Sequence, residues 1–219
     1  MSIENRKTLE AYQKTAKKYL ENSIEHNQLD IEKAKKKKEK LENFLEKSFR
    51  SLPKGSKILE IGSADGENAK YLKELGYDVI ASDVADDFLK AISEAGFDPL
   101  KFNVLEDEFK EKYFGIFCWR VFVHFTKEDA LKVIKKVYDA LEENGLFVFT
   151  AINRETRQTD EEWVDFPGEY HMGIDRFYHY HTAEDLEDAI AETDFDIIDF
   201  HKEGGDQHNK WLVYVLKKQ

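Results

Sequence analysis

The first fifty residues carry apolar side chains at helical spacing. In residues 4–21, and again in residues 28–50, apolar positions recur along one face of a predicted helix. This period predicts two amphipathic helices ahead of the rest of the chain. The polar stretch from Asn22 to Asn27 is the predicted joint between them.

The period changes after Pro53 and Gly55, where short apolar runs alternate with helical patterns. This alternation is typical of parallel strands joined by right-handed crossover helices, so it predicts a doubly wound α/β fold. The predicted strands cover residues 57–61, 78–82, 99–102, 115–119 and 146–152, and the predicted helices cover residues 67–75, 86–95 and 127–141, the last closed by Asn144-Gly145.

The pattern changes again after residue 152. We expect a loop over residues 153–174, a helix over 183–192, and strands over 196–201 and 211–216. Gly204-Gly205 between these strands indicates an antiparallel hairpin, which we place at one sheet edge. The 219 residues suit a single domain. Its expected parts are a helical N-terminal cap at 1–52, a core at 53–152, an insertion at 153–181, and a closing helix and hairpin at 182–219.

Composition narrows the expected partners and compartment. The net charge is −12, and residues 51–219 hold 20 Lys and Arg against 36 Asp and Glu. The excess of acidic residues in this part of the chain disfavours contact with phosphate backbones, so we expect no nucleic-acid partner. The basic run from Lys35 to Lys38, flanked by glutamates, is interpreted as a solvated helix face. A single cysteine, Cys118, and the lack of a signal-peptide or membrane-spanning pattern predict a cytoplasmic protein with no membrane association.

The segment from Lys57 to Gly66 predicts a ligand site, because a buried strand runs into a turn that opens a helix. Gly62 and Gly66 permit tight curvature, and backbone N–H groups at the helix start are expected to be free for a carboxylate or another polar group. Glu60, at the strand end, is expected to accept a hydrogen bond from an ammonium.

Two further strand ends carry polar side chains. Asp83 ends the second predicted strand about twenty residues past the glycine turn, where doubly wound folds place an acid on ribose hydroxyls. Asn103 and Val104 follow the third strand, where an amide can read an adenine edge beside an apolar neighbour. We therefore expect these strand ends to surround one nucleoside.

These motifs resemble those of the class I S-adenosylmethionine-dependent methyltransferases. The first motif of that family usually reads acidic-x-Gly-x-Gly-x-Gly, and here it is Glu60-Ile-Gly-Ser-Ala-Asp-Gly66. The resemblance covers residues 56–152, including the stretch from Leu141 to Phe149, which is similar to the family's glycine turn and fifth strand. It implies a seven-stranded, mostly parallel sheet and S-adenosylmethionine as cofactor.

The same resemblance implies a set of cofactor contacts. These are Glu60, Gly62, Ser63, Ala64 and Gly66 for the methionine end, Asp83 and Val84 for the ribose, Asn103 and Val104 for the adenine, and Cys118 and Trp119 after the fourth strand. A small packed residue without a ligand contact is the alternative for Cys118. Tyr12 and Tyr19, on one face of the first helix, would form a lid over the cofactor. Simple packing of these two rings against the sheet is the alternative.

The sequence departs from the family pattern at two positions. Ala64 stands where the middle glycine is common, and it is expected to exclude a positive φ there. Phe114 stands where an acid often precedes the fourth strand. An ordinary strand-to-helix turn is the alternative to a ligand loop. A dinucleotide oxidoreductase is the other alternative, but its motif would need glycine at Ala64 and Glu67.

The acceptor of the methyl group is expected beyond the fourth strand and in the insertion. Val121 to Thr126 resembles a hydrophobic segment with a histidine in small-molecule members, so His124 would orient the acceptor or take its proton. A structural histidine bonded to backbone is the alternative. In the insertion, Arg176 would clamp an acidic substrate group and Tyr178 would line the pocket, unless the segment is only a surface strand.

The resemblance implies methyl transfer to an oxygen or nitrogen atom of a small molecule, with alignment of the two reactants as the main catalytic device. We expect no metal, because the spacing of His171, His179 and His181 matches no strong ligand pattern. A catalytically inactive protein that keeps the fold and binds the cofactor or a partner is the alternative. The expected assembly is a monomer or a homodimer.

Overall fold

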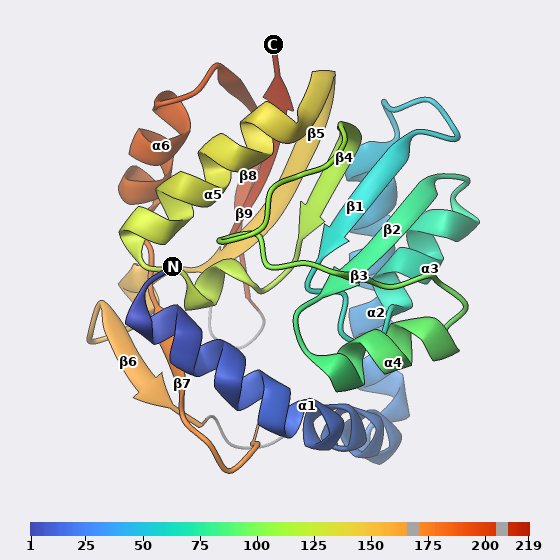
Figure 1. Cartoon of the computed structure of the whole chain (residues 1–219), viewed down its shortest axis with the longest axis vertical. Helices are drawn as coiled ribbons and strands as arrows, with labels where there is room; N and C mark the ends of the chain where they lie inside the picture. The colour runs from blue at the N-terminus through green and yellow to red at the C-terminus, as the bar shows by residue number, and fades with distance from the viewer. Residues whose placement is uncertain (166–170, 205–209) are drawn as a thin grey trace.

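The computed structural model describes residues 1–165, 171–204 and 210–219. Its centre is a seven-stranded sheet of order β3-β2-β1-β4-β5-β9-β8 (Figure 1). The strands are β1 (Lys57–Ile61), β2 (Asp78–Asp83), β3 (Leu100–Lys101), β4 (Tyr113–Cys118), β5 (Leu141–Ile152), β8 (Phe195–Glu203) and β9 (Trp211–Lys218). The first five pair in parallel, and β9 runs antiparallel to both β5 and β8. The predicted doubly wound sheet with an antiparallel hairpin at one edge is confirmed; Gly205 of the predicted hairpin turn lies outside the described residues.

Helices cover both faces of the sheet, because alternate residues of a strand point to opposite sides. On β5, Phe147 and Phe149 belong to a core shared with α5 (Lys127–Ala140) and α6 (Ala183–Ala191). Their neighbours Leu146 and Val148 belong to a second core shared with α2 (Ile31–Phe49) and α3 (Glu67–Glu74). The last sheet-covering helix, α4 (Asp86–Glu94), packs against β2. Burial of each large apolar side chain contributes about 1.5–3 kcal/mol, and this burial fixes the strand ends in space.

The N-terminal cap consists of α1 (Ile3–Leu29) and α2. The prediction of a joint from Asn22 to Asn27 is wrong, because these residues continue α1 as helix. The break comes at Asp30, whose side chain accepts a hydrogen bond from Lys33 N–H at 3.0 Å and so caps α2. In Figure 1, α1 crosses the carboxyl ends of the central strands, and it packs against α4.

Residues 153–181 contain regular structure where a loop over 153–174 was predicted. A short 3₁₀ helix, η2 (Arg154–Thr156), precedes β6 (Glu161–Val164), which pairs antiparallel with β7 (Arg176–His179). The strand β6 has only four residues, too few to show a clear alternation in the sequence. The hairpin lies beside α1 (Figure 1), where the Phe177 N–H donates to Thr8 Oγ1 at 3.0 Å. This contact places the insertion next to the cap.

The boundary between α5 and β5 also differs from the prediction. The helix ends at Ala140 and the strand begins at Leu141, so Asn144-Gly145 lies inside the strand rather than at a helix end. Asn144 has φ +63°, and the pairing of β4 with β5 shifts its register there, which is the geometry of a bulge. The predicted helix over 183–192 is confirmed as α6, and Thr182 caps it, since Thr182 Oγ1 accepts from Asp185 N–H at 3.0 Å. In the described part of the chain, no helix has both the length and the apolar character to cross a bilayer.

Candidate active site

A cavity of about 750 Å³ lies at the carboxyl ends of the strands, beneath the cap helices. Eleven of the sequence-predicted site residues line it: Tyr12, Tyr19, Gly62, Ser63, Ala64, Asp83, Val84, Asn103, Val104, Trp119 and His124. The other five are not part of the lining: Glu60, Gly66, Cys118, Arg176 and Tyr178. The topology therefore brings strand ends and cap residues that are far apart in sequence around one space.

The turn after β1 requires unusual backbone conformations. Gly62 has φ +77°, and a Cβ at this position would lie 2.5 Å from Val121 Cγ2, so only glycine fits. Ala64 has φ +49°, so the expectation that alanine would exclude a positive φ is wrong. The left-handed region is open to alanine at a modest energetic cost, and here the Ala64 N–H donates to Asp83 Oδ2 at 3.0 Å. That hydrogen bond helps hold the strained turn.

Several backbone donors of the turn before α3 are engaged within the protein, so these particular N–H groups are not free for a ligand. The N–H groups of Gly62 and Ser63 both donate to the Ser82 carbonyl, at 3.0 and 2.9 Å, and the Gly66 N–H donates to the Ser63 carbonyl at 2.8 Å. The reason is that the turn continues the pairing of β1 with β2 past the end of β1. The N–H groups of Gly62, Ser63 and Gly66 therefore stabilise the turn itself.

Asp83, at the end of β2, is the buried carboxylate of the cavity wall, with 5% of its surface exposed. Its Oδ1 accepts from Val84 N–H at 2.7 Å, and its Oδ2 accepts from Ala64 N–H at 3.0 Å. Burial raises the pKa of Asp83, and the hydrogen bonds from Ala64, Val84 and Ala85 oppose this rise. The backbone thus fixes the orientation of a carboxylate that has further lone pairs for a ligand.

Glu60 lies behind the turn and is fully buried. Its Oε1 accepts from Asn68 Nδ2 at 3.0 Å, and Asn68 itself lines the cavity. Its Oε2 has no hydrogen-bond partner among the described residues. Burial raises the pKa of Glu60 to about 7, the largest effect on this group. Cys118, on β4, is also fully buried, and burial raises the pKa of its thiol, so it is a packed core residue.

Asn103 and Val104 lie at the cavity wall beyond β3. Asn103 Oδ1 accepts from Leu105 N–H at 3.1 Å, which closes a local turn and orients the side chain. Val104 is buried, and Phe88 of α4 adds an aromatic ring to the same cavity. Apolar surface and an oriented amide thus occur together at the place where the sequence predicted an adenine.

The part of the cavity wall near β4 and β9 contains aromatic residues that sequence reasoning largely missed. Trp119 stacks on Phe117 with ring centroids 5.6 Å apart and lies 5.4 Å from Phe44 of α2. The Arg120 guanidinium lies 5.1 Å from the ring of Trp211 on β9. Phe44, Arg120 and Trp211 all line the cavity. The apolar face of the second helix could have indicated Phe44, but no local signal places Trp211 here.

The basic run of α2 borders the same cavity. Lys36 and Lys38 line it while their side chains remain exposed. Lys36 pairs with Glu32 at 2.9 Å, and Lys38 pairs with Glu67 of α3 at 2.7 Å. These lysines are exposed, as a solvated helix face requires. The sequence did not indicate that they also lie at the cavity.

His124 ends the 3₁₀ helix η1 (Phe122–His124), and both of its ring nitrogens have protein partners. Nδ1 lies 2.6 Å from the Phe177 carbonyl oxygen, and Nε2 lies 2.9 Å from Tyr12 Oη. Because a carbonyl only accepts, Nδ1 carries the proton of the neutral ring and Nε2 accepts from the Tyr12 hydroxyl. Burial, reinforced by the Arg176 charge, lowers the pKa of His124 to about 4, so the ring is neutral at pH 7.

Arg176 is fully buried behind these two residues. Its guanidinium lies 5.5 Å from the Tyr12 ring centroid and 5.7 Å from that of Tyr178. Nη1 lies 3.4 Å from Tyr12 Oη, and Nη2 lies 3.5 Å from Asp165 Oδ1. A guanidinium enclosed by protein groups does not face an acceptor, which argues against the substrate clamp expected from sequence. Tyr178, 6% exposed, packs behind His124 and does not line the cavity.

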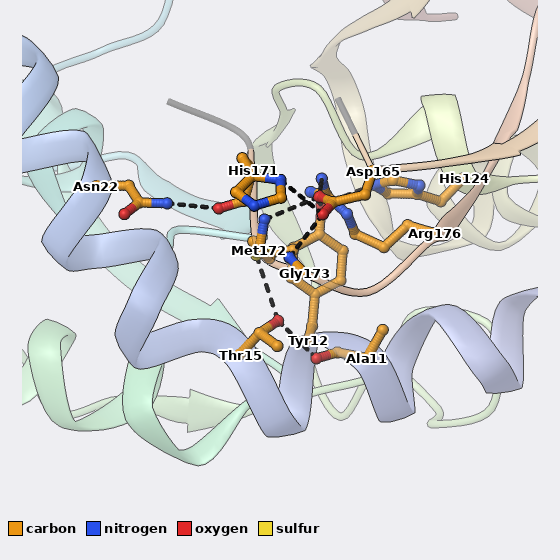
Figure 2. A network of polar contacts seen from close by, with 10 residues as sticks. All are labelled: Ala11, Tyr12, Thr15, Asn22, His124, Asp165, His171, Met172, Gly173 and Arg176. Carbon is orange, nitrogen blue, oxygen red and sulfur yellow. Dashed lines mark hydrogen bonds and ion pairs between the residues drawn. The ribbon is translucent and has the colours of Figure 1, made fainter. Parts of the chain in front are cut away.

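Figure 2 shows how this cluster ties the insertion to α1. Asp165 accepts from the N–H groups of Met172 and Gly173 at 2.8 and 2.6 Å. His171 Nδ1 lies 2.9 Å from Asp165 Oδ2, and Asn22 of α1 donates to the His171 carbonyl at 2.6 Å. Within the described residues, no three His, Cys, Asp or Glu side chains gather as a metal site. These contacts hold the segment after residue 170 against the cap.

Comparison with known proteins identifies the family. A family model described as a methyltransferase domain matches residues 31–199. The chain belongs to this family. As a member of it, this methyltransferase uses S-adenosylmethionine as methyl donor. A comparison with curated proteins gave no match.

Solved structures share the fold of this methyltransferase. The magnesium protoporphyrin IX methyltransferase from Synechocystis PCC 6803, with bound S-adenosylmethionine, has a TM-score of 0.72 at 11% identity, covering 100% of this chain and 99% of that chain. A protein from Pyrococcus horikoshii OT3 has a TM-score of 0.68 at 18% identity, covering 86% and 92%. An S-adenosylmethionine-dependent methyltransferase from Methanosarcina mazei has a TM-score of 0.65 at 15% identity, covering 77% and 95%.

The residues at the cavity fit S-adenosylmethionine. The unpartnered Oε2 of Glu60 suits an ammonium, and Asn68 connects Glu60 to the cavity. The oriented carboxylate of Asp83 suits ribose hydroxyls. The rings of Tyr12 and Tyr19 line the same space and would favour a sulfonium through their faces. The methyltransferase therefore has groups of the correct chemistry for the ammonium, the ribose and the sulfonium of this cofactor.

Proposed function

We propose that this methyltransferase transfers a methyl group to an oxygen or nitrogen atom of a small molecule held in the cavity beneath α1 and α2. The observation that carries the proposal is that one cavity joins two chemically different sides. Asp83 ends β2 and Asn103 follows β3, on one side of β1 in the sheet. The aromatic residue Trp119 follows β4 and Trp211 begins β9, on the other side. The first side suits the nucleoside of the cofactor, and the second suits an acceptor.

The chain's contribution to the reaction is alignment and exclusion of water. S-adenosylmethionine, when bound, supplies an electrophilic methyl group. Asp83 would orient the ribose, since two backbone N–H groups hold its carboxylate in place. The helix α1 covers the cavity, and its Tyr12 contacts His124 on the opposite wall. Holding both reactants in a closed space converts a two-body reaction into an effectively unimolecular one.

A small acceptor is favoured over a nucleic acid by charge and shape. Residues 51–219 carry 20 Lys and Arg against 36 Asp and Glu, so the part that forms the sheet and insertion repels phosphate chains. Residues of α1 and α2 also form part of the cavity lining. A cavity of about 750 Å³ is within the range that holds a cofactor or a drug-sized ligand.

Isothermal titration with S-adenosylmethionine and S-adenosylhomocysteine tests the first half of the proposal. Binding of both with one site per chain is expected, and lack of binding would reject it. Incubation of the protein with labelled cofactor and a panel of phenols, alcohols, amines and sugars tests the second half. Cofactor binding without turnover on any acceptor would favour an inactive protein that keeps the fold.

A further inference from the structure

The contact between Tyr12 and His124 places a proton relay at the cavity wall. We propose that Tyr12 is a catalytic residue of this methyltransferase that takes the proton of a hydroxyl acceptor while passing its own proton to His124. The inference rests on the proposed function and deepens it, because it names an alcohol or phenol as the acceptor class. It also assigns Tyr12, expected from sequence only as a lid, a chemical role.

The hydrogen-bond geometry fixes the direction of the relay. His124 Nδ1–H donates to the Phe177 carbonyl at 2.6 Å, which leaves Nε2 as the acceptor of the neutral ring. Tyr12 Oη lies 2.9 Å from Nε2, so the phenol proton points at His124. One lone pair of Tyr12 Oη accepts from Arg176 Nη1 at 3.4 Å, so the other lone pair remains as the acceptor side, and Tyr12 lines the cavity. A substrate hydroxyl at this wall would donate to Tyr12, not to His124.

The chemistry of methyl transfer requires such an acceptor for a hydroxyl substrate. As an electron pair of the acceptor oxygen forms the bond to the methyl carbon, the carbon–sulfur bond breaks and its electron pair stays on sulfur. The acceptor oxygen gains positive charge, so its proton becomes strongly acidic. That proton moves to Tyr12 Oη, and the Tyr12 proton moves to His124 Nε2. Tyr12 ends neutral, and His124 carries the released proton until it is lost to water.

The surrounding charges indicate that His124 holds the transferred proton only briefly. Arg176 on β7 lies 3.4 Å from Tyr12 Oη through Nη1, so it stabilises negative charge that develops on the phenol oxygen. The same cation disfavours a lasting imidazolium, and the pKa of His124 is lowered to about 4. Two acids lie near the relay: Asp83 of β2 acts on Tyr12, and Asp165 contacts Arg176. An oxygen that is being methylated is acidic enough to protonate even so weak a base.

The alternative acceptor classes have less need of this arrangement. A carboxylate substrate is already ionised at neutral pH and has no proton to give. The nitrogen of an amine can keep its proton as a stable ammonium after methylation. A hydroxyl oxygen cannot keep its proton, and it benefits from a base within hydrogen-bond reach. The buried Tyr12–His124 pair therefore favours oxygen over nitrogen as the methylated atom.

The hydrogen bonding can be tested on the ligand-free protein. Histidine ¹⁵N spectra of the wild type should show His124 as the Nδ1-protonated neutral tautomer, and Tyr12→Phe should shift its Nε2 resonance. Tyr138→Phe removes a phenol hydroxyl from α5, away from the cavity, and should leave the His124 signals unchanged. An Nε2-protonated tautomer of His124, or no response to Tyr12→Phe, would overturn the proposal.

The catalytic role is tested by turnover with phenol, 4-nitrophenol and aniline as acceptors. Tyr12→Phe is expected to lower kcat for phenol by about 10²–10⁴-fold, with little change in KM or in cofactor affinity. At alkaline pH, 4-nitrophenol is ionised and has no proton to give. Tyr12→Phe should therefore lower kcat for 4-nitrophenol much less than it lowers kcat for phenol. If Tyr12 had only a structural role, Tyr12→Phe would lower the rates for phenol and 4-nitrophenol equally. That result would overturn the relay.

The controls separate this inference from the proposed function. Failure of the wild type to bind S-adenosylmethionine would reject the proposed function itself. Normal cofactor binding by wild type and Tyr12→Phe, with methylation of aniline but of neither phenol, would overturn only the hydroxyl assignment. Equal turnover of phenol by wild type and Tyr12→Phe would overturn the relay while leaving the methyltransferase intact.

Discussion

Replacing Glu60 by glutamine is expected to stabilise the ligand-free fold at neutral and alkaline pH while weakening the cofactor site. Glu60 is fully buried, and its Oε2 has no hydrogen-bond partner among the described residues. Its pKa is raised from 4.5 to about 7 by burial. The folded protein therefore keeps a proton on Glu60 that the unfolded chain releases above about pH 4.5.

The sign and size of the effect follow from this difference in pKa. Between about pH 4.5 and 7 the folded state binds more protons than the unfolded state, so stability falls as the pH rises. Each pKa unit corresponds to about 1.4 kcal/mol, so the full penalty above pH 7 is about 3 kcal/mol. Glutamine stays neutral at every pH and avoids the penalty. The stability gain of Glu60→Gln should thus be about 3 kcal/mol larger at alkaline pH than at mildly acidic pH.

Urea unfolding of ligand-free wild type and Glu60→Gln at about pH 5 and about pH 8 measures this difference. Other titrating groups are common to both proteins and cancel in the comparison. Glu10→Gln, the same exchange at an exposed position of α1, serves as the matched control and should change little at either pH. Cofactor affinity of Glu60→Gln should fall by about 1.5–3 kcal/mol through loss of a charged hydrogen bond. The same Glu60→Gln effect on stability at both pH values would refute the reasoning.

Three further predictions follow from single contacts. Asp83→Ala should weaken S-adenosylmethionine binding by about 1–3 kcal/mol in isothermal titration, and unchanged affinity would remove Asp83 from the site. Gly62→Ala should lower the unfolding temperature far more than Gly96→Ala, because a Cβ at Gly62 meets Val121 at 2.5 Å whereas that at Gly96, also at positive φ, meets nothing within 4 Å. At saturating cofactor, the rate of methyl transfer should keep its value down to about pH 5 and fall as His124 is protonated near pH 4, and a fall centred at pH 6.5 would contradict the lowered pKa.

The parts of the fold that depend on local sequence could be predicted. The strand β1, the glycine turn and Asp83 follow from apolar runs and turn residues that lie close together in the chain. The conformation of Ala64 could not be predicted, because the turn is imposed by pairing with Ser82 and Asp83, which overrides the local preference of alanine. The bend at Asp30 had a usable signal, since aspartate is a common N-cap residue.

The parts of the site that depend on distant contacts were hidden in the sequence. Arg176 looks like a substrate clamp in an exposed loop, but pairing of β7 with β6 and packing against α1 bury it. His124 looks like a residue that contacts the acceptor, but Tyr12, 112 positions away in the chain, covers its Nε2. Such contacts depend on how the cap packs over the sheet, which no pattern of residue types encodes.

The hydrogen bonds that anchor α1 affect the order in which the protein folds during translation. Asn5 donates to Asp129, Tyr12 pairs with His124, and Thr8 accepts from Phe177. The partners Asp129, His124 and Phe177 lie 124, 112 and 169 residues after the residues of α1 that they bond. Each partner therefore leaves the ribosome long after α1 itself. The first segment to be made is therefore fully anchored only after β7 has been made. A nascent chain that stops short of β7 would lack the Phe177 anchor, and α1 would be held by α4, Asp129 and His124.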